Sequence, residues 1–501
     1  MKYEKGQIIM GKVRLIINED NSHYFCQDAQ MAERGIKRFI EQYENTGVTD
    51  LFFNVNAMNA SFDSEVFGTN WDIDENARYV EDQFKHMADC SKHLNSGGKS
   101  LYREWIELSR ERNISPWISM RMNDVHGVEN EDNALHSDFW RDHPEYRRVN
   151  YRFTDWPDKA LDYGRKEVRD YAIAFIREIA DRFNLDGLEL DWMRFGFHFR
   201  PGFEQSGAAA LNQLMRDVRA ILNEAETKHG HAIKLAARVP ASPESALGLG
   251  YDAATWAQEG LIDLLIVTPF FWTLDTDMPI EIWQRLLRGT KAKLAAGLEI
   301  QVTASPKDDP LLNSLETMRG AAWSYINRGV DAVYLFNFMH SGGEYDHLAD
   351  SSCDIFFNKN DEYRKFLQEI SDIDAMRGKS RRHVVTFSDT WAPGEAKGYL
   401  LPAALGNDKW WKEFRVNIGE PPVSTQDAYV VISINDGVRP NIWVNGVKCE
   451  ESCFILETAP IPIGTQYSYK IPKDALHHGY SLVEAEGGAG ELVWVEICIG
   501  T

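Results

Sequence analysis

The sequence predicts an α/β fold, a (β/α)8 TIM barrel, followed by an all-β sandwich of the jelly-roll type. The barrel is predicted by eight short apolar runs that alternate with helical stretches across residues 8–370, because strands that alternate with helices build closed or open parallel sheets. The sandwich is predicted by a change after the basic stretch 377–382, where short alternating runs separated by turn signals replace the helices. We therefore expect a barrel domain at residues 1–376 and a sandwich domain at 377–501.

The barrel elements follow from the local pattern. Strands are expected at 13–17, 51–56, 117–122, 187–191, 233–239, 262–269, 294–302 and 332–338. Helices are expected at 29–43, 101–111, 165–183, 208–228, 253–259, 280–288, 311–328 and 363–370, where apolar residues recur at helical spacing. Long insertions follow the second and third strands. A doubly wound open sheet is the alternative, and because no GxGxxG follows the first strand, its dinucleotide-binding form is excluded.

The sandwich elements are shorter and alternate. Strands are expected at 429–434, 441–444, 467–471 and 492–499. Turns are expected at Asn435-Asp436-Gly437 and at Asn445-Gly446, because Asn-Gly and Asp-Gly favour the tight turns that join paired strands.

Charge and composition exclude several classes of partner. The 501 residues carry 54 Lys and Arg against 76 Asp and Glu, a formal charge of −22. This acidic excess argues against nucleic acid and against an anionic membrane surface as partners. The first residues are charged and not an apolar leader, and six cysteines show no CxxC pair. We therefore expect a cytoplasmic protein with reduced thiols, unless a leader has been removed; association of identical chains stays open.

Polar residues in the expected strands indicate which side chains face the barrel axis. Because side chains alternate along a strand and helices cover the outside, a polar member of the alternation should face the axis or the open mouth. This rule selects residues that lie mostly at the carboxyl ends of their strands, where barrel enzymes keep their active sites. They are Asn54, Asn56, Ser119, Arg121, Asn123, Glu189, Asp191, Lys234, Arg238, Glu299 and Asn337.

The segment Asp186-Gly187-Leu188-Glu189-Leu190-Asp191-Trp192 carries the strongest signal. Glu189 and Asp191 lie two residues apart on one strand face, so their like charges raise the pKa of one carboxyl group while a nearby arginine lowers the pKa of the other. An acid and a base of this kind are what glycosidic bond cleavage needs. The alternative is a buried ion network with Arg121 and Arg238.

A second carboxylate is needed across the mouth. Glu299, at the end of the seventh strand, is the first candidate, and Asp124, Asp275 and Asp277 are in reserve. We expect Asp191 and Glu299 to act as the catalytic pair, with Glu189 in support.

The remaining polar and aromatic residues at the mouth are expected to bind substrate. Asn56, Arg121, Asn123, Arg238 and Asn337 would position a sugar, and Arg194 together with two of these arginines favours an acidic one. His126 and His340 would bind sugar hydroxyls, because no HxH or HExxH spacing supports a metal site. Trp272, just after the sixth strand, would stack on a sugar ring.

Two motifs carry a resemblance to a known family. Trp117-Ile118-Ser119-Met120-Arg121-Met122-Asn123-Asp124 and the 186–192 segment resemble the bacterial glycoside-hydrolase-like TIM barrels of the family-10-like glycosyl hydrolase group. The second motif is also similar to the chitinase strand DG-x-D-x-D-x-E, but Met193 stands where that family has its acid glutamate. Ile442-Trp443-Val444-Asn445-Gly446 resembles the V-x-V-N-G hairpin of galactose-binding-like jelly rolls.

The expected function is hydrolysis of an O-glycosidic bond in an oligosaccharide or glycoside, without a cofactor or metal. Two alternatives stay open at this point. One is a non-catalytic glycan-binding barrel, in which the acidic strand is only structural. The other is a metal-dependent hydrolase of a different bond.

Overall fold

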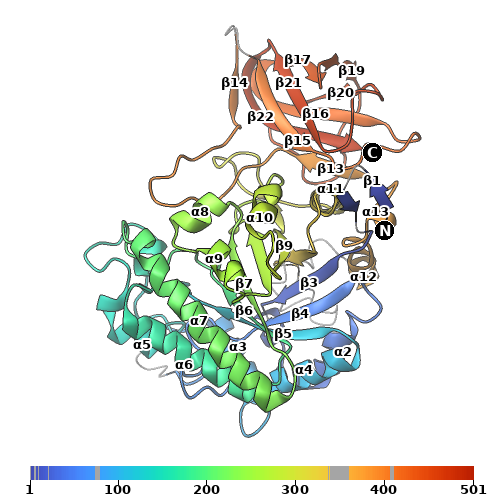
Figure 1. Ribbon diagram of the computed structural model, residues 1–501. Helices are drawn as coiled ribbons and strands as arrows, with labels where there is room; N and C mark the ends of the chain where they lie inside the picture. Colours follow the sequence, from blue (N-terminus) through green and yellow to red (C-terminus); the bar gives the residue numbers. More distant parts are fainter. Residues whose placement is uncertain are drawn as a thin grey trace.

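The structure, a computed structural model, describes residues 2–4, 7–9, 11–20, 22–73, 79–336, 338, 360–406 and 411–500. Eight parallel strands close into a barrel in the order β12-β3-β4-β5-β6-β7-β8-β9, and helices surround it. Two antiparallel sheets form a sandwich above the barrel (Figure 1). The predicted fold class is confirmed. None of the helices in the described part of the chain combines the length and the apolar character that crossing a membrane requires.

The barrel elements overlap the predicted ones. The strands are β3 (Arg14–Glu19), β4 (Val48–Asn54), β5 (Ser115–Arg121), β6 (Gly187–Asp191), β7 (Lys234–Pro240), β8 (Leu264–Thr268), β9 (Lys293–Leu298) and β12 (Ala332–Leu335). The main helices are α2 (Ala29–Glu41), α4 (Leu101–Glu111), α6 (Lys166–Arg182), α7 (Glu204–His229), α9 (Ala253–Gln258), α10 (Ile280–Leu286), α11 (Leu315–Asn327) and α12 (Asn360–Glu369).

The lower part of the barrel interior is a packed apolar core. Phe52 and Trp117 stack there with ring centroids 4.6 Å apart, and Tyr334 meets Phe52 edge-on. Gly187 leaves room for the indole, since a Cβ at this position would lie 2.2 Å from a ring carbon of Trp117. The apolar filling below leaves the polar inward side chains to the upper layers, at the carboxyl ends of the strands.

Two predicted barrel features are wrong. The insertion after β4 contains a helix, α3 (Asp82–Asn95), which has few apolar residues and buries only a narrow stripe. The helix expected from residue 311 begins at 315 instead, because Ser314 and Thr317 form a capping box at its start. The two residues β11 (Leu311–Leu312) pair with β10 (Gln301–Val302).

The sandwich consists of a six-stranded and a four-stranded sheet. The first sheet holds β13 (Arg381–Val384), β22 (Ala489–Ile499), β16 (Ala428–Val438), β20 (Thr465–Lys470), β19 (Glu450–Ser452) and β14 (Ala403–Leu405). The second holds β15 (Lys412–Asn417), β21 (Tyr480–Glu486), β17 (Asn441–Val444) and β18 (Val447–Lys448).

One of the two predicted sandwich turns is confirmed and the other is wrong. Asn445 and Gly446 have φ of 51° and 79° and join β17 to β18 as a two-residue hairpin. Residues 435–437 instead belong to β16, where the register with β22 shifts at a bulge. Close backbone approach explains the glycine there, because a Cβ on Gly437 would lie 1.8 Å from the carbonyl oxygen of Ala489.

A buried carboxyl group, that of Glu19, lies on the outer side of β3. Glu19 is fully buried, accepts a hydrogen bond from the Tyr43 hydroxyl, and lies 3.6 Å from Nε2 of His23. Burial raises the pKa of Glu19 to about 8, against the hydrogen bond from Tyr43, and the charge of Asp20 adds to the rise. The folded protein therefore keeps a proton here that the unfolded chain releases near a pH of about 4.3.

Glu19→Gln should make the protein more stable in alkaline solution. Between about pH 4.3 and pH 8 the folded state binds one proton more than the unfolded state, so the parent loses up to about 1.4 kcal/mol of unfolding free energy per pH unit in this window. The glutamine does not titrate, so its advantage over the parent should grow from pH 5 to pH 8. Urea unfolding at several pH values measures this, with the exposed Glu413→Gln as control; an advantage that does not change with pH would contradict the assignment.

Candidate active site

Asp191 ends β6 and faces the barrel interior, where it forms an ion pair with Arg238 of β7. Nη1 of Arg238 donates to its two carboxylate oxygens at 3.2 and 3.0 Å. The backbone N–H groups of Met193 and Arg194 donate to Oδ1 at 2.9 and 2.8 Å. Both partners of the pair are buried. Three of these four hydrogen bonds converge on Oδ1, and Oδ2 accepts only the shorter of the two Arg238 contacts, at 3.0 Å.

Glu189 lies one layer deeper on the same strand face. It accepts hydrogen bonds from Asn18 at 3.0 Å and from the Tyr334 hydroxyl at 2.8 Å. Burial, and then the charge of Asp191, raise the pKa of Glu189 above its ordinary value, although Ser119 and Arg238 act in the opposite direction. The two carboxyl groups of β6 therefore have different environments. Asp191 is ion-paired with Arg238, whereas the raised pKa of Glu189 favours its protonated form.

Glu299, just beyond the end of β9, interacts electrostatically with the Arg238 guanidinium, as Asp191 does. It is buried, and its Oε1 accepts the N–H of Ile300 at 2.8 Å. Burial lowers the pKa of Arg238, but the negative charges around it, those of Asp191 and Glu299 included, raise it to a net value above the usual one. The ring of Phe336 lies against Arg238, 3.8 Å from the guanidinium carbon.

A second cluster of charged side chains lies at the rim of the barrel, above the ends of β3 and β5. Arg121 pairs with Asp20 at 2.6 Å and with Asp124 at 3.3 Å. Asp124 accepts a hydrogen bond from Nδ1 of His126 at 2.8 Å, and Nη2 of Arg194 lies 3.2 Å from Nε2 of the same ring. The side chain of His126 is 42% exposed, in contrast to its buried partner Asp124.

These contacts define the state of the histidine. A guanidinium can only donate, so Nε2 of His126 accepts from Arg194 and the ring proton sits on Nδ1, facing Asp124. Burial would raise the pKa of Asp124, but His126 and Arg121 outweigh it and hold the pKa well below its usual range. The rim therefore presents an oriented, solvent-facing imidazole backed by an ionised carboxylate.

Two of the predicted substrate-binding residues bond to the backbone. Asn56 accepts from the N–H of Arg121 at 3.1 Å and donates to its carbonyl at 3.0 Å. Asn123 makes the same pair of contacts with Leu161, at 3.0 and 3.1 Å. They hold the end of β5 and the insertion that follows it.

The reserve carboxylates after β8 lie in a different part of the molecule. Asp277 pairs with Arg415 at 2.5 Å and accepts the Tyr480 hydroxyl at 2.8 Å, so it joins the barrel to the sandwich. Burial and the nearby charge of Asp277 raise the pKa of Asp275 to about 7, although a backbone hydrogen bond from Asp277 opposes the rise. Asn337 and His340 lie outside the described residues.

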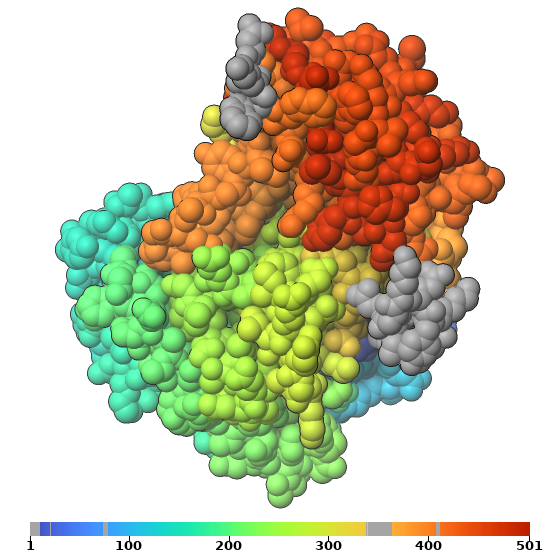
Figure 2. Space-filling model, turned by 45° about the horizontal axis from the view of Figure 1, so that its top comes forward, coloured from blue at the N-terminus to red at the C-terminus, as the bar shows by residue number. Residues whose placement is uncertain are grey.

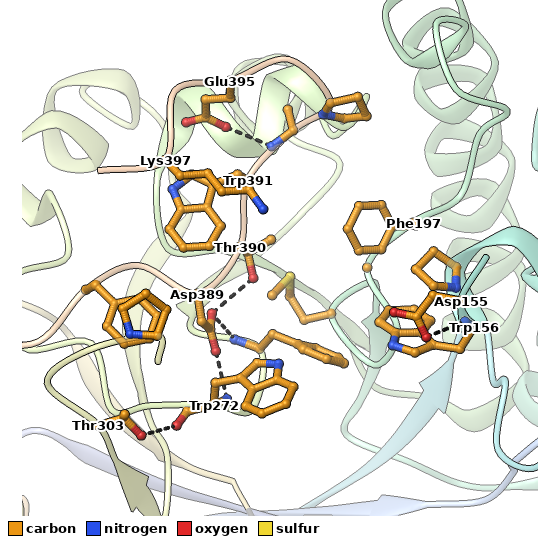
Figure 3. A pocket seen from close by; sticks show the side chains of 18 of the residues that line it. Asp155, Trp156, Phe197, Trp272, Thr303, Asp389, Thr390, Trp391, Glu395 and Lys397 are labelled. Carbon is orange, nitrogen blue, oxygen red and sulfur yellow. Dashed lines mark hydrogen bonds between the residues drawn. The ribbon is translucent and has the colours of Figure 1, made fainter. Parts of the chain in front are cut away.

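A cavity of about 520 Å³ opens among the loops that follow the barrel strands (Figure 3). It is lined by the loops after β6, β8 and β9, by part of the insertion after β5, and by the segment between β13 and β14. Trp272 is one of its walls and is 55% exposed. The wall includes Met193, whose N–H is bonded to Asp191, so the cavity adjoins the carboxylate cluster. Six of its twenty lining residues are aromatic: Trp156, Phe197, Phe270, Trp272, Phe387 and Trp391.

Residues 386–397, here called the strap, form one side of this cavity. In Figure 2 this segment, in light orange, lies between the red sandwich and the green and cyan part of the barrel. The carboxylate of Asp389 accepts the backbone N–H groups of Phe270, Phe271 and Trp272 at 2.8, 2.9 and 3.0 Å. The strap is therefore anchored to the loop that carries Trp272.

Several residues of the site were missed by sequence reasoning. Asp20 and Tyr334 could have been found, because each continues the inward alternation of its strand: Asp20 follows Asn18 in β3, and Tyr334 follows Ala332 in β12. The strap had no such signal, since residues 386–397 have no regular secondary structure and lie in the predicted sandwich domain before its first expected strand.

Comparisons with known proteins give only distant likenesses. No family model matches the chain, and no curated protein matches its sequence. Among solved structures it is similar to a cycloisomaltooligosaccharide glucanotransferase from Paenibacillus sp., with 7% identity and a TM-score of 0.34 over 96% of this chain and 57% of that one. It is also similar to the maltogenic α-amylase AmyB from Thermotoga neapolitana, with 11% identity and a TM-score of 0.40 over 93% of this chain and 98% of that one. A third similar structure is the PgaB glycoside hydrolase domain from Bordetella bronchiseptica, with 9% identity and a TM-score of 0.41 over 71% of this chain and 99% of that one.

The chain thus spans 57% of the length of the glucanotransferase. At such identities and TM-scores these likenesses assign neither a family nor a reaction to this chain.

Proposed function

We propose that the chain is a glycoside hydrolase that cleaves an O-glycosidic bond at the carboxyl end of the barrel. The observation that carries the proposal is the cluster of buried carboxyl groups around Arg238, to which Asp191 and Glu299 both belong, next to the Met193 wall of an aromatic cavity. Acid–base chemistry on a glycosidic bond needs two groups of different protonation state, and sugars and their substituents pack on aromatic faces. The resemblance of the β5 and β6 motifs to the family-10-like glycosyl hydrolases agrees with this.

In this proposal Asp191 and Glu299 are the catalytic pair. Asp191, ion-paired with Arg238, is the nucleophile or base, and Glu299 is the acid. The bond from the anomeric carbon to the leaving oxygen breaks, its electron pair stays on that oxygen, and the oxygen takes the proton of the acid. Water supplies the new oxygen on the anomeric carbon and the proton that restores the acid.

The other charged groups bind the sugar. Arg121, Arg194 and His126 face the mouth from the rim, and two of them are cations, which favours a sugar that carries a carboxylate. Residues 1–376 carry this chemistry in the proposal, and residues 377–501 form an accessory domain that contributes the strap. Asn337 and His340 remain proposed binding residues.

A glycoside panel tests the proposal. It contains methyl, benzyl and aryl glycosides and oligosaccharides of neutral sugars and of uronic acids, and the released reducing sugar is measured. We expect hydrolysis of at least one class, with uronic acid glycosides preferred. Sugar binding without turnover across the whole panel would contradict the proposal.

That outcome would favour a second candidate, a non-catalytic glycan-binding barrel. The observation in its favour is the bonding of Asp191, whose Oδ1 already accepts three hydrogen bonds and which is 1% exposed. In such a protein the carboxylates and Arg238 would serve only as a buried ion network that shapes the barrel mouth.

A further inference from the structure

The cavity beside the carboxylates differs from them in chemical character. Its volume of about 520 Å³ falls in the range of sites for small molecules. In Figure 3 Trp391 lies on one side, Phe197 and Trp156 lie on the other, and Trp272 lies below. A flat apolar group in this cavity would therefore meet ring faces on several sides.

Three polar side chains of the wall, those of Asp389, Glu395 and Thr303, are already used within the protein. Both oxygens of Asp389 accept backbone N–H groups. Glu395 accepts from the Ser245 hydroxyl and from the N–H of Ala392, at 2.9 and 2.8 Å. The hydroxyl of Thr303 donates to the carbonyl of Trp272 at 2.9 Å. These groups are committed to holding the strap and the loops.

This arrangement suits an apolar ligand better than a sugar ring. A sugar presents several hydroxyls, and each one that is buried without a hydrogen-bond partner weakens binding. An aromatic ring has no such requirement and gains from burial against other rings. One wall residue, Met193, lies two residues beyond Asp191 and donates its N–H to that carboxylate, so this wall of the cavity adjoins the proposed catalytic residue.

We propose that this cavity is the subsite for an aromatic aglycone, and that the substrates are glycosides of aromatic alcohols or phenols and not chains of sugars. The inference rests on the proposed function, because an aglycone is defined by the bond that is cleaved. Trp391 is the specificity-determining side chain, since the strap brings it over the cavity from outside the barrel. Nζ of Lys397 lies 5.4 Å from the ring of Trp391, at the exposed edge of the cavity.

Binding of a free aglycone tests the inference without any turnover. 2-Naphthol is titrated into the full chain by calorimetry, beside glucose, glucuronic acid and a disaccharide. We expect the wild-type protein to bind 2-naphthol more tightly than any of the free sugars. Trp391→Ala should weaken 2-naphthol binding about tenfold. Trp411→Ala is the matched control, because Trp411 is equally aromatic but packs on Trp443 in the sandwich, and it should leave binding unchanged.

Kinetics provide the second measurement. Benzyl and methyl glycosides of one sugar have leaving groups of similar acidity, so the ratio of their kcat/KM values reports on the aglycone subsite. Trp391→Ala should lower this ratio about tenfold and change kcat/KM for the methyl glycoside little. Thermal unfolding of each variant shows whether it is folded.

The outcomes separate the two proposals. If no glycoside is cleaved but 2-naphthol binds and depends on Trp391, the hydrolase proposal fails and the apolar site stands. If oligosaccharides are cleaved, 2-naphthol binds no better than glucose and the ratio is unchanged in Trp391→Ala, the hydrolase proposal stands and the aglycone inference is overturned. Disaccharide binding that is lost in Trp391→Ala while 2-naphthol does not bind would also overturn it, because the cavity would then be a sugar subsite.

Discussion

Asp191→Asn should reduce kcat/KM for the best glycoside of the panel by at least about 10³-fold and leave the fold intact. Asparagine keeps the shape of the side chain and can still accept the N–H groups of Met193 and Arg194, which hold Oδ1 in the parent. It has no negative charge, so it can neither attack the anomeric carbon nor take up a proton. The loss should therefore appear in kcat more than in KM.

The control is Asp427→Asn, which removes a carboxylate that pairs with Lys470 on the sandwich surface. This variant should retain parental kinetics. Circular dichroism and urea unfolding show that both variants are folded. Parental kinetics in Asp191→Asn would refute its catalytic role and move the barrel toward the binding-only alternative.

Arg238→Met should lower the free energy of unfolding by about 3–5 kcal/mol at neutral pH. Methionine retains most of the apolar stem and loses the guanidinium, whose carbon lies 3.8 Å from the centre of the Phe336 ring, so the main loss is electrostatic. Removing one member of a buried ion pair leaves the other charge, here Asp191, without compensation in a site shielded from water. Urea unfolding measures the loss.

The double variant Arg238→Met/Asp191→Asn isolates this cause. It removes both charges, so it should recover a large part of the stability lost in the single variant. Arg216→Met, which breaks an exposed ion pair with Glu259, should change stability little. Equal losses in the single and double variants would show that packing, and not charge, holds the barrel mouth together.

Much of the barrel could be predicted because its signals are local. Every predicted strand overlaps an observed one, since burial on both faces makes a parallel strand apolar over a few consecutive residues. The alternation of side chains along the strands also predicted that Glu189, Asp191 and Arg238 face the barrel interior, and there Arg238 forms an ion pair with Asp191. The helix α3 was not predicted because it has few apolar residues at helical spacing. The start of α11 was predicted too early because the capping box at Ser314, and not the apolar periodicity, sets where the helix begins.

The sequence by itself therefore determined the fold class and the order of the barrel strands along the chain. Only the tertiary structure decided which carboxylate is ion-paired, that Asp277 joins the sandwich to the barrel, and that the strap walls the aromatic cavity. The reason is physical. The period of two or 3.6 residues that reveals a strand or a helix is a pattern among residues close together in the chain. The contact of Asp389 with three N–H groups more than 100 residues earlier instead depends on how separate elements pack together.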